Sequence, residues 1–249
     1  MFKILKRKVL IPIFIAVLLV IAIVFGLLFY NGILLINNPS HEKFPVRGVD
    51  LSAYQGEVDF NILAQNDIDF CFIKATEGSS FVDKKFNANY ENAQKTELFV
   101  GAYHFFSFES GGKEQAEHFI KNVKVINKML PPVVDLEFYG DFFKNKPEKE
   151  KVQKELNAFI DEIYKHYKIK PIIYATKDSY DLYLSGKYKE YDIWIRDILS
   201  SPKLSDGREW TFWQYTNRAR LKGYSGREKY IDVNVFNGTK EEFLTKYKK

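Results

Sequence analysis

The chain of 249 residues has one cysteine, Cys71, and only four histidines, which are scattered along the sequence. A single cysteine excludes an internal disulfide framework and any cysteine-based zinc cluster. The histidines form no H-E-x-x-H motif and no other paired metal spacing, so we expect neither a metal nor another cofactor. Because Cys71 lies inside an apolar segment, we expect it in the core rather than as a nucleophile.

Signatures of several other protein classes are also missing. No glycine-rich phosphate loop follows any predicted strand, and no G-x-S-x-G nucleophile elbow occurs. The chain has 37 basic and 32 acidic residues, but four of the basic ones precede the first acid, Glu42. Without those four (37 − 4 = 33), the balance is 33 to 32 and gives no support for nucleic-acid binding.

The sequence does contain one long apolar run, residues 9–30, after a short basic segment. At 1.5 Å per residue the run spans about 33 Å, which matches a hydrocarbon core of about 30 Å. A cleaved signal peptide is the alternative, but its apolar core is about 7–15 residues long and is followed by small residues. We therefore expect a cytoplasmic basic stub at 1–8, a single-pass transmembrane anchor at 9–30, a linker at 31–45 and an extracytoplasmic domain at 46–249.

Strand and helix patterns alternate along the exported part. Eight apolar runs are typical of strands: 46–51, 70–75, 99–106, 132–138, 170–175, 191–195, 210–215 and 230–236. Helical periodicity predicts helices at 60–65, 83–95, 113–126, 148–167 and 179–184. The last strands follow each other with little room for helices. The α/β pattern predicts a degenerate (β/α) barrel of about eight strands with irregular C-terminal strands, and an open doubly wound sheet is the alternative.

Polar residues gather at the predicted carboxyl ends of these strands, where such a barrel carries its active site. They are Asp50, Lys74, Tyr103, His104, Asp135, Glu137, Tyr174, Trp194, Gln214, Tyr215 and Asp232. Carboxylates, amides and aromatic rings on one rim are the composition of a carbohydrate site.

The sharpest feature is the sequence Asp135-Leu136-Glu137, which ends an apolar strand. Because residues i and i+2 of a strand point to the same face, both carboxylates would enter the barrel mouth about 6.6 Å apart. Repulsion and apolar surroundings should raise the pKa of one of them, and a carboxyl that stays protonated can protonate a glycosidic oxygen. A pair of surface acids on an edge strand is the plainer alternative.

The other candidate residues also have plainer interpretations. Asp50 could cap a helix, although Asp59 is better placed to cap the predicted helix at 60–65. Asp232 could be a turn residue or a salt-bridge partner. Lys74 and Glu77 could line the rim or form an ordinary buried ion pair.

Seven segments, in this order, resemble glycoside hydrolase family 25, the Chalaropsis-type lysozymes. They are GVDLSAYQG at 48–56, FIKATEG at 72–78, GAYHF at 101–105, PVVDLE at 132–137, PIIY at 171–174, WQYT at 213–216 and IDVNVF at 231–236. The resemblance implies a flattened β/α barrel and N-acetylmuramidase activity on the β-1,4 bond between N-acetylmuramic acid and N-acetylglucosamine in peptidoglycan. The chain departs from the family pattern after Trp194-Ile195, where a small residue is expected and Arg196 stands instead.

The resemblance also implies roles for individual residues. By motif position, the four acids of the family site are Asp50, Asp135, Glu137 and Asp232, with Glu137 as the general acid/base. Groove residues would be Tyr54, Tyr103, Tyr174, Trp194 and Gln214. We expect a monomer whose partner is the peptidoglycan glycan strand. A catalytically silent, membrane-tethered peptidoglycan-binding domain is the alternative, and a chitin-like substrate is a narrower one. The complete set of acids favours an active enzyme.

For the mechanism we expect retention of anomeric configuration, with the 2-acetamido oxygen of the substrate as the nucleophile. Asp135 would accept a hydrogen bond from the acetamido N–H and stabilise the charged oxazolinium intermediate. Substrate assistance is a known exception to the two-carboxylate scheme. The alternatives are inversion through a water held by an aspartate, and a protein nucleophile at Asp50 or Asp232.

Overall fold

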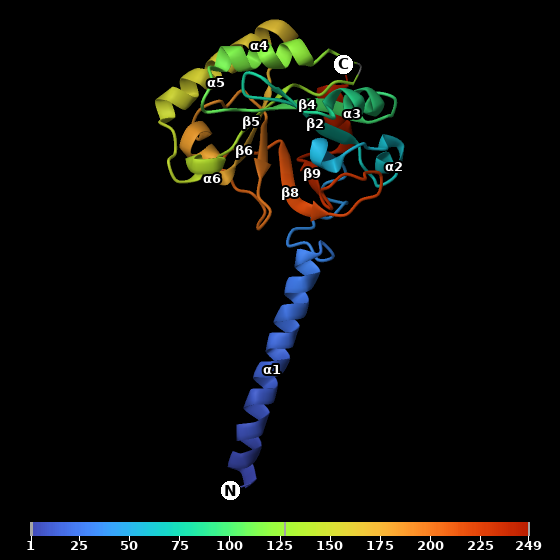
Figure 1. The fold of residues 1–249 in the computed structure, drawn as a ribbon, viewed down its shortest axis with the longest axis vertical. Coiled ribbons are helices and arrows are strands. Elements are labelled where there is room, and N and C mark those ends of the chain that lie inside the picture. The colour runs from blue at the N-terminus through green and yellow to red at the C-terminus, as the bar shows by residue number, and fades with distance from the viewer. Residues whose placement is uncertain (1, 127, 249) are drawn as a thin grey trace.

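The computed structural model describes residues 2–126 and 128–248 and shows a mixed α/β body with one long helix projecting from it (Figure 1). That helix, α1 (Phe2–Tyr30), begins before the apolar run at 9–30. Residues 2–8 of the expected basic stub are therefore helical as well, whereas Met1 lies outside the described residues. The stretch Leu10–Tyr30 has a mean hydropathy of 3.2, and none of it is buried within the protein. By length and composition α1 could cross a membrane.

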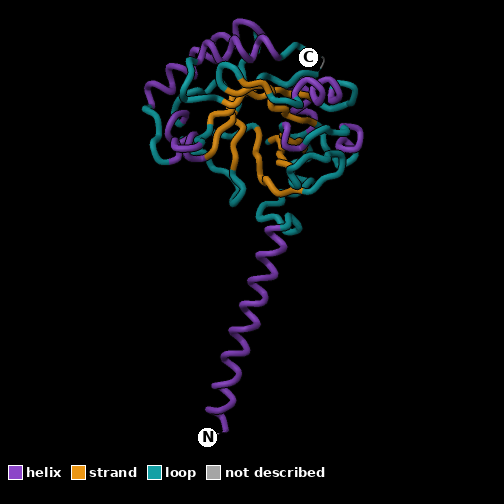
Figure 2. The backbone as a smooth tube through the Cα atoms, viewed as in Figure 1, coloured by secondary structure: helices purple, strands orange, loops and turns teal. Residues whose placement is uncertain are grey.

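The body is built on a nine-stranded sheet that curves round and closes on itself (Figure 2). Its strands are β1 (Arg47–Leu51), β2 (Phe70–Glu77), β3 (Phe81–Val82), β4 (Phe99–Phe105), β5 (Val133–Leu136), β6 (Ile172–Thr176), β7 (Ile193–Arg196), β8 (Phe212–Ala219) and β9 (Ile231–Phe236). The spatial order is β1-β9-β8-β7-β6-β5-β4-β2-β3, and a further β1–β2 pairing closes eight strands into a barrel. The short β3 lies antiparallel on β2 outside that ring.

Strand direction makes this a degenerate barrel, as the sequence predicted. Within the ring, neighbouring strands are parallel in the order β1-β2-β4-β5-β6-β7-β8, whereas β9 is antiparallel to both β8 and β1. The register of β8 against β9 shifts twice, between Gln214 and Thr216 and between Thr216 and Ala219. The irregular C-terminal strands are therefore confirmed, and the open doubly wound alternative is wrong because β1 and β2 close the sheet.

Helices cover the outside of the barrel, and the last helix along the chain covers the amino ends of its parallel strands. They are α2 (Phe60–Ala64), α3 (Phe86–Ala93), α4 (Gly112–Asn122), α5 (Lys149–Tyr167), α6 (Lys177–Ser179) and α7 (Lys240–Tyr247), with short turns η1 (Ala53–Gln55), η2 (Gly140–Phe143) and the π-helical η3 (Tyr180–Leu184). Asp59 caps α2 as predicted, because its carboxylate accepts the backbone N–H groups of Asn61 and Ile62. The sequence analysis did not predict β3 or α7, and the helix that it expected at 179–184 is α6 followed by η3.

Aromatic side chains fill the barrel interior at the amino ends of the parallel strands. Phe70 and Phe99 begin β2 and β4, and both pack against Phe243 of α7, with ring centroids 5.8 and 5.0 Å apart. Two glycines make room for this core: a Cβ on Gly48 would lie 2.2 Å from the Phe70 ring, and one on Gly101 would lie 2.3 Å from that of Phe72. The amino ends of the strands are thus plugged, so a cleft can form only at their carboxyl ends.

Candidate active site

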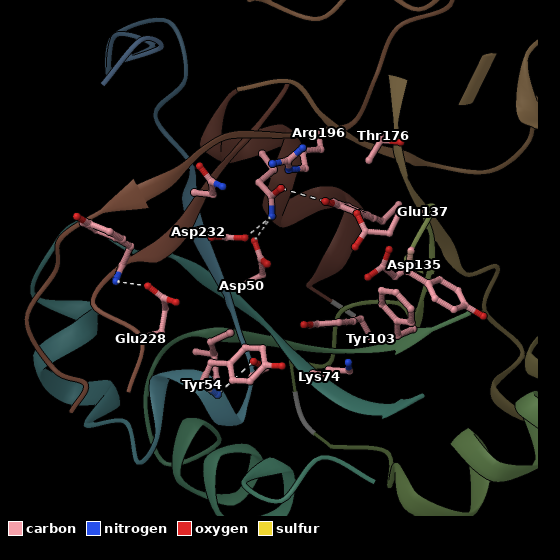
Figure 3. A pocket seen from close by; sticks show the side chains of 18 of the residues that line it. Asp50, Tyr54, Lys74, Tyr103, Asp135, Glu137, Thr176, Arg196, Glu228 and Asp232 are labelled. Carbon is pink, nitrogen blue, oxygen red and sulfur yellow. Dashed lines mark hydrogen bonds between the residues drawn. The ribbon is translucent and has the colours of Figure 1, made fainter. Parts of the chain in front are cut away.

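A cleft of about 830 Å³ opens at the end of the barrel where the parallel strands finish (Figure 3). It is lined by all the predicted acids and groove residues: Asp50, Tyr54, Lys74, Tyr103, Asp135, Glu137, Tyr174, Trp194, Gln214 and Asp232. The prediction that Asp232 lies at the carboxyl end of its strand is wrong, because Asp232 reaches this rim from the beginning of β9. Since β9 runs antiparallel to β1, Asp232 pairs directly with Asp50 of β1.

Amide side chains hold Asp50 and Asp232 together. The Gln214 amide nitrogen donates to Asp50 Oδ2 at 2.8 Å and to Asp232 Oδ2 at 3.0 Å. The Asn234 amide nitrogen also donates to Asp50 Oδ2, at 2.8 Å, and its oxygen accepts from the Trp194 indole N–H at 2.8 Å. Because both amides are themselves buried and held in place, the positions of the two carboxyls are fixed before any ligand arrives.

Burial dominates the electrostatics of this pair. Loss of solvent raises the pKa of Asp50 from its usual 3.8 to about 6, although the hydrogen bonds from Asn234 and Gln214 lower it. Burial also raises the pKa of Asp232 well above its usual value, and the neighbouring charge of Asp50 raises it further. Near neutral pH the two carboxyls therefore hold protons more tightly than carboxyls in water.

Asp135 and Glu137 reach into the cleft next to each other from the end of β5 (Figure 3). Asp135 is 6% exposed, and its Oδ1 atom has no hydrogen-bond partner within 2–126 and 128–248. Burial and the charge of Glu137 raise the pKa of Asp135 well above its usual value. Burial also raises the pKa of Glu137, which is half-buried, and the charge of Asp50 adds to that rise. Two neighbouring carboxyls with different exposure suit acid/base chemistry on a glycosidic bond.

The sequence and the fold match known glycosidases. The model of the family described as "Glycosyl hydrolases family 25" matches residues 49–224. The chain belongs to glycosyl hydrolase family 25. The solved structure of a family 25 glycosyl hydrolase from Bacillus anthracis is 52% identical, with a TM-score of 0.78, and the match covers 84% of this chain and 99% of that one.

Two further relatives carry the name lysozyme. Lysozyme M1 from Streptomyces globisporus is 30% identical over 219 residues, which cover 80% of this chain and 70% of that protein. The crystal structure of a bacterial lysozyme from Streptomyces coelicolor is 28% identical, with a TM-score of 0.73, and the match covers 82% of this chain and 97% of that one. The resemblance seen in the sequence motifs and the predicted enzyme class, a glycosidase, are confirmed.

Three cationic side chains, those of Lys74, Arg196 and Arg218, line this family 25 cleft. Lys74 lines it, as one of the two interpretations expected. It also forms an ion pair with Glu77, 2.7 Å from Nζ to Oε2, but the Glu77 side chain is 43% exposed, so this is not the buried pair of the other interpretation. Arg196, at the end of β7, stands where the family pattern predicts a small residue, and it lines the cleft as well. Its positive charge lowers the pKa values of Asp50, Glu137 and Asp232 and so opposes the effect of burial.

Several further residues that line the cleft were not predicted. Besides Arg196 they are Tyr30, Leu51, Ser52, Gln55, Phe105, Phe138, Tyr139, Phe143, Thr176, Asn217, Arg218, Glu228 and Tyr230. Many lie at or just after the end of a strand, in the irregular part of β8 or in the loop between β8 and β9, where no periodic pattern marks a side chain as facing the barrel mouth. Asn234 was missed too, although it lies two residues after Asp232 on one strand and therefore shares its face.

Two residues predicted at the rim point elsewhere. His104 is fully buried on the outer face of β4, between Thr76 Oγ1 at 2.7 Å and Gln115 Oε1 at 3.0 Å, and its ring stacks on Phe159. Tyr215 accepts a hydrogen bond from Arg47 on the outside of β8. Successive residues of a strand point to opposite faces. Because Tyr103 and Gln214 face the cleft, the residues that follow them, His104 and Tyr215, face away from it. Cys71 is fully buried, as predicted, and burial raises the pKa of its thiol.

Proposed function

We propose that the protein is an N-acetylmuramidase that cleaves the β-1,4 bond between N-acetylmuramic acid and N-acetylglucosamine in peptidoglycan. The observation that carries the proposal is the pair of neighbouring carboxyls, Asp135 and Glu137, whose pKa values burial raises at the mouth of a family 25 barrel. Lysozyme M1 and the Streptomyces coelicolor lysozyme support the substrate by their names. The remaining cleft, with tyrosines and amides beside the acids, has the composition that a chain of sugars requires.

Glu137 is the proposed general acid and, in the second half of the reaction, the general base. Burial and the charge of Asp50 raise its pKa, which favours the protonated form that a leaving sugar oxygen needs. It is also more exposed than Asp135 and lies beyond the last residue of β5, where a glycosidic bond can reach it. Asp50 and Asp232, held by Gln214, complete the polar floor beside it.

Asp135 is proposed to bind and polarise the substrate's acetamido group. Its Oδ1 atom, without a partner among the described residues, is an acceptor ready for an acetamido N–H. That bond would push the acetamido oxygen towards the anomeric carbon while Glu137 donates its proton to the leaving oxygen. A cyclic oxazolinium ion and a free sugar hydroxyl result. Water, deprotonated by Glu137, then opens the ring with net retention.

The variant Glu137→Gln tests the acid directly. Glutamine keeps the shape of the side chain but cannot supply the proton, so the rate should fall by roughly 10²–10⁴-fold while glycan binding is largely kept. Glu150→Gln, an exposed glutamate of α5, is the matched control and should turn over like the wild type. Wild-type turnover by Glu137→Gln would refute the assignment. A wild-type protein that binds glycan without cleaving it would instead identify a silent binding domain.

Proton NMR of the first reducing end formed tests the mechanism. An initial β-anomer is the expected product of a retaining reaction on a β-linkage, and an initial α-anomer would show inversion. A thiazoline analogue of the oxazolinium ion should then bind more tightly than the plain sugar. Failure of that analogue after a β-anomer would point to Asp50 or Asp232 as the nucleophile.

The proposed placement of the enzyme is a single-pass anchor with the barrel outside the cytoplasm. Residues 1–8 would form the cytoplasmic stub, 9–30 the span, 31–45 the linker and 46–249 the catalytic domain. Supporting this placement are the hydropathy of Leu10–Tyr30 and a substrate that lies outside the cytoplasm. N-terminal sequencing of the protein from membranes should begin at Met1 or Phe2, and a start within 31–40 would refute the anchor. The proposed monomer can be tested by the mass of the detergent-solubilised protein.

A further inference from the structure

The end of β8 and the loop that joins it to β9 carry a concentration of positive charge. We define the basic hairpin as residues 217–230, which contain Arg218, Arg220, Lys222, Arg227 and Lys229 but Glu228 as the one acid. Arg220, Lys222, Arg227 and Lys229 are exposed. This surface differs from the rest of the exported part, whose basic and acidic residues nearly balance, so a local partner of negative charge is indicated.

The basic hairpin contacts the last turn of α1. Arg218 Nη1 and the Tyr230 hydroxyl both donate to the backbone oxygen of Tyr30, at 2.8 and 2.6 Å, and the Arg218 guanidinium lies over the rings of Phe29 and Tyr30. The chain then turns away at Gly32, whose φ is +63° and where a Cβ would lie 2.1 Å from the backbone oxygen of Arg218. Only a glycine permits this close approach.

These contacts determine where the hairpin lies if α1 spans a membrane, a premise that rests on the proposed function. Tyr30 ends the apolar stretch, so its carbonyl marks the boundary between hydrocarbon and headgroups. A guanidinium hydrogen-bonded to that carbonyl must lie at the level of the headgroups. Tyrosine side chains are enriched at that depth, and basic side chains are attracted to anionic lipids there.

We propose that the basic hairpin binds anionic lipid headgroups and holds the mouth of the barrel against the membrane surface. Tyr30, Arg218 and Tyr230 belong to the cleft as well as to this contact. Figure 1 shows β8 and β9 on the side of the body nearest to the end of α1. The cleft therefore opens beside the bilayer, and its substrate is a glycan strand in the layer of peptidoglycan next to the membrane. An anionic polymer of the wall could also bind cations, but the contacts with the end of α1 favour the lipid surface.

The test uses the full-length protein in lipid discs whose headgroups carry a nitroxide quencher. A fluorophore is attached at Lys222→Cys in the hairpin or, as the matched control, at the exposed Lys121→Cys in α4, on the side of the body far from α1 (Figure 1). Cys71 is buried, so the introduced thiol reacts selectively. With phosphatidylglycerol in the discs, fluorescence at 222 should be quenched and that at 121 should not. Phosphatidylcholine alone should weaken the quenching at 222.

Charge reversal separates lipid binding from simple proximity to the helix. The triple variant Arg220→Glu, Lys222→Glu, Lys229→Glu, labelled at the exposed Ser225→Cys, should lose the phosphatidylglycerol-dependent part of the quenching. The same label with Lys121→Glu, Lys151→Glu and Lys154→Glu should keep it. None of these residues lines the cleft, so hydrolysis of soluble glycan fragments should persist and show that each variant is folded.

Three outcomes would overturn the proposal. Equal quenching at 222 and 121 in both lipids would show that the hairpin does not meet the membrane. Loss of binding to intact cell walls by the first triple variant, without any lipid-dependent quenching in the parent, would assign the hairpin to a wall polymer. Exclusion of the full-length protein from the discs would refute the anchor itself. If the wild type does not hydrolyse glycan at all, the muramidase proposal is refuted, whereas lipid-dependent quenching at 222 would still support the lipid contact.

Discussion

The buried carboxyl of Asp50 should limit the stability of the fold at neutral pH. Burial raises the pKa of Asp50 from 3.8 to about 6, and at 1.36 kcal/mol per pH unit this corresponds to about 3 kcal/mol. Because the folded state binds the Asp50 proton more tightly than the unfolded state does, protonation of Asp50 stabilises the fold. This contribution is complete below pH 3.8 and is lost as the pH rises through about 6.

Asp50→Asn removes this ionisation with little change of shape. The asparagine oxygen can still accept from Gln214 and Asn234, and its amide group can donate towards Asp232. We expect a gain of up to about 3 kcal/mol at pH 7, or a Tm higher by roughly 6–12 °C, and little gain near pH 4. The variant should also lower the pKa of Glu137, since the charge of Asp50 raises it.

Thermal unfolding of the full-length protein in detergent, followed by circular dichroism from pH 4 to pH 8, measures the gain in stability at each pH. The pH–rate profile on soluble glycan measures the change in the pKa of Glu137. The matched control is Asp161→Asn, an exposed aspartate on α5, which should leave the Tm unchanged at every pH. An equal gain at pH 4 and pH 7, or a loss of stability at pH 7, would refute the reasoning that a buried charge is being removed.

Three further substitutions test the network around the cleft. Arg196→Ala removes a charge that lowers the pKa of Glu137, so the alkaline limb of the pH–rate profile on soluble glycan should move to higher pH; an unchanged profile would contradict this. Burial lowers the pKa of His104 from 6.5 to about 3, so the protein loses stability as the pH falls below 6.5. His104→Gln should therefore narrow the difference between the denaturant midpoints measured at pH 7.5 and pH 4.5. An unaltered difference would show that His104 is not responsible for this loss. Asn234→Leu leaves the Trp194 indole N–H unpaired and removes a donor to Asp50, which should cost about 2–4 kcal/mol in chemical denaturation; a neutral result would mean that water replaces the amide.

The barrel could be predicted from the sequence because its strands carry strong local signals. Each is a short apolar run, and the acids Asp50 and Asp135 stand near the ends of two of them. The two residues of β3 are too few to show any period. α7 could have been found, because Thr239 and Glu242 form a capping box at its start. Its role as the plug of the barrel depends on contacts with distant strands, and no local pattern encodes those.

The acids of the candidate site could be predicted from the sequence, but the hydrogen-bond network around them could not. Strand alternation shows that only one of two neighbours, such as Tyr103 and His104, faces the barrel interior. It does not show which of the two does. The direction of β9 decides how Asp232 reaches the rim, and short apolar strands do not reveal their direction. The contact between Arg218 and Tyr30 joins residues far apart in the chain, so only the folded structure shows that the cleft lies beside the end of α1.

Mass spectrometry of purified peptidoglycan tests the central claim most directly. The sacculi are digested with the wild type or with Glu137→Gln, and the new reducing ends are converted to alcohols with borohydride before analysis. We expect fragments ending in N-acetylmuramitol from the wild type and almost none from the variant. Fragments ending in N-acetylglucosaminitol, or equal cleavage by both proteins, would contradict that claim.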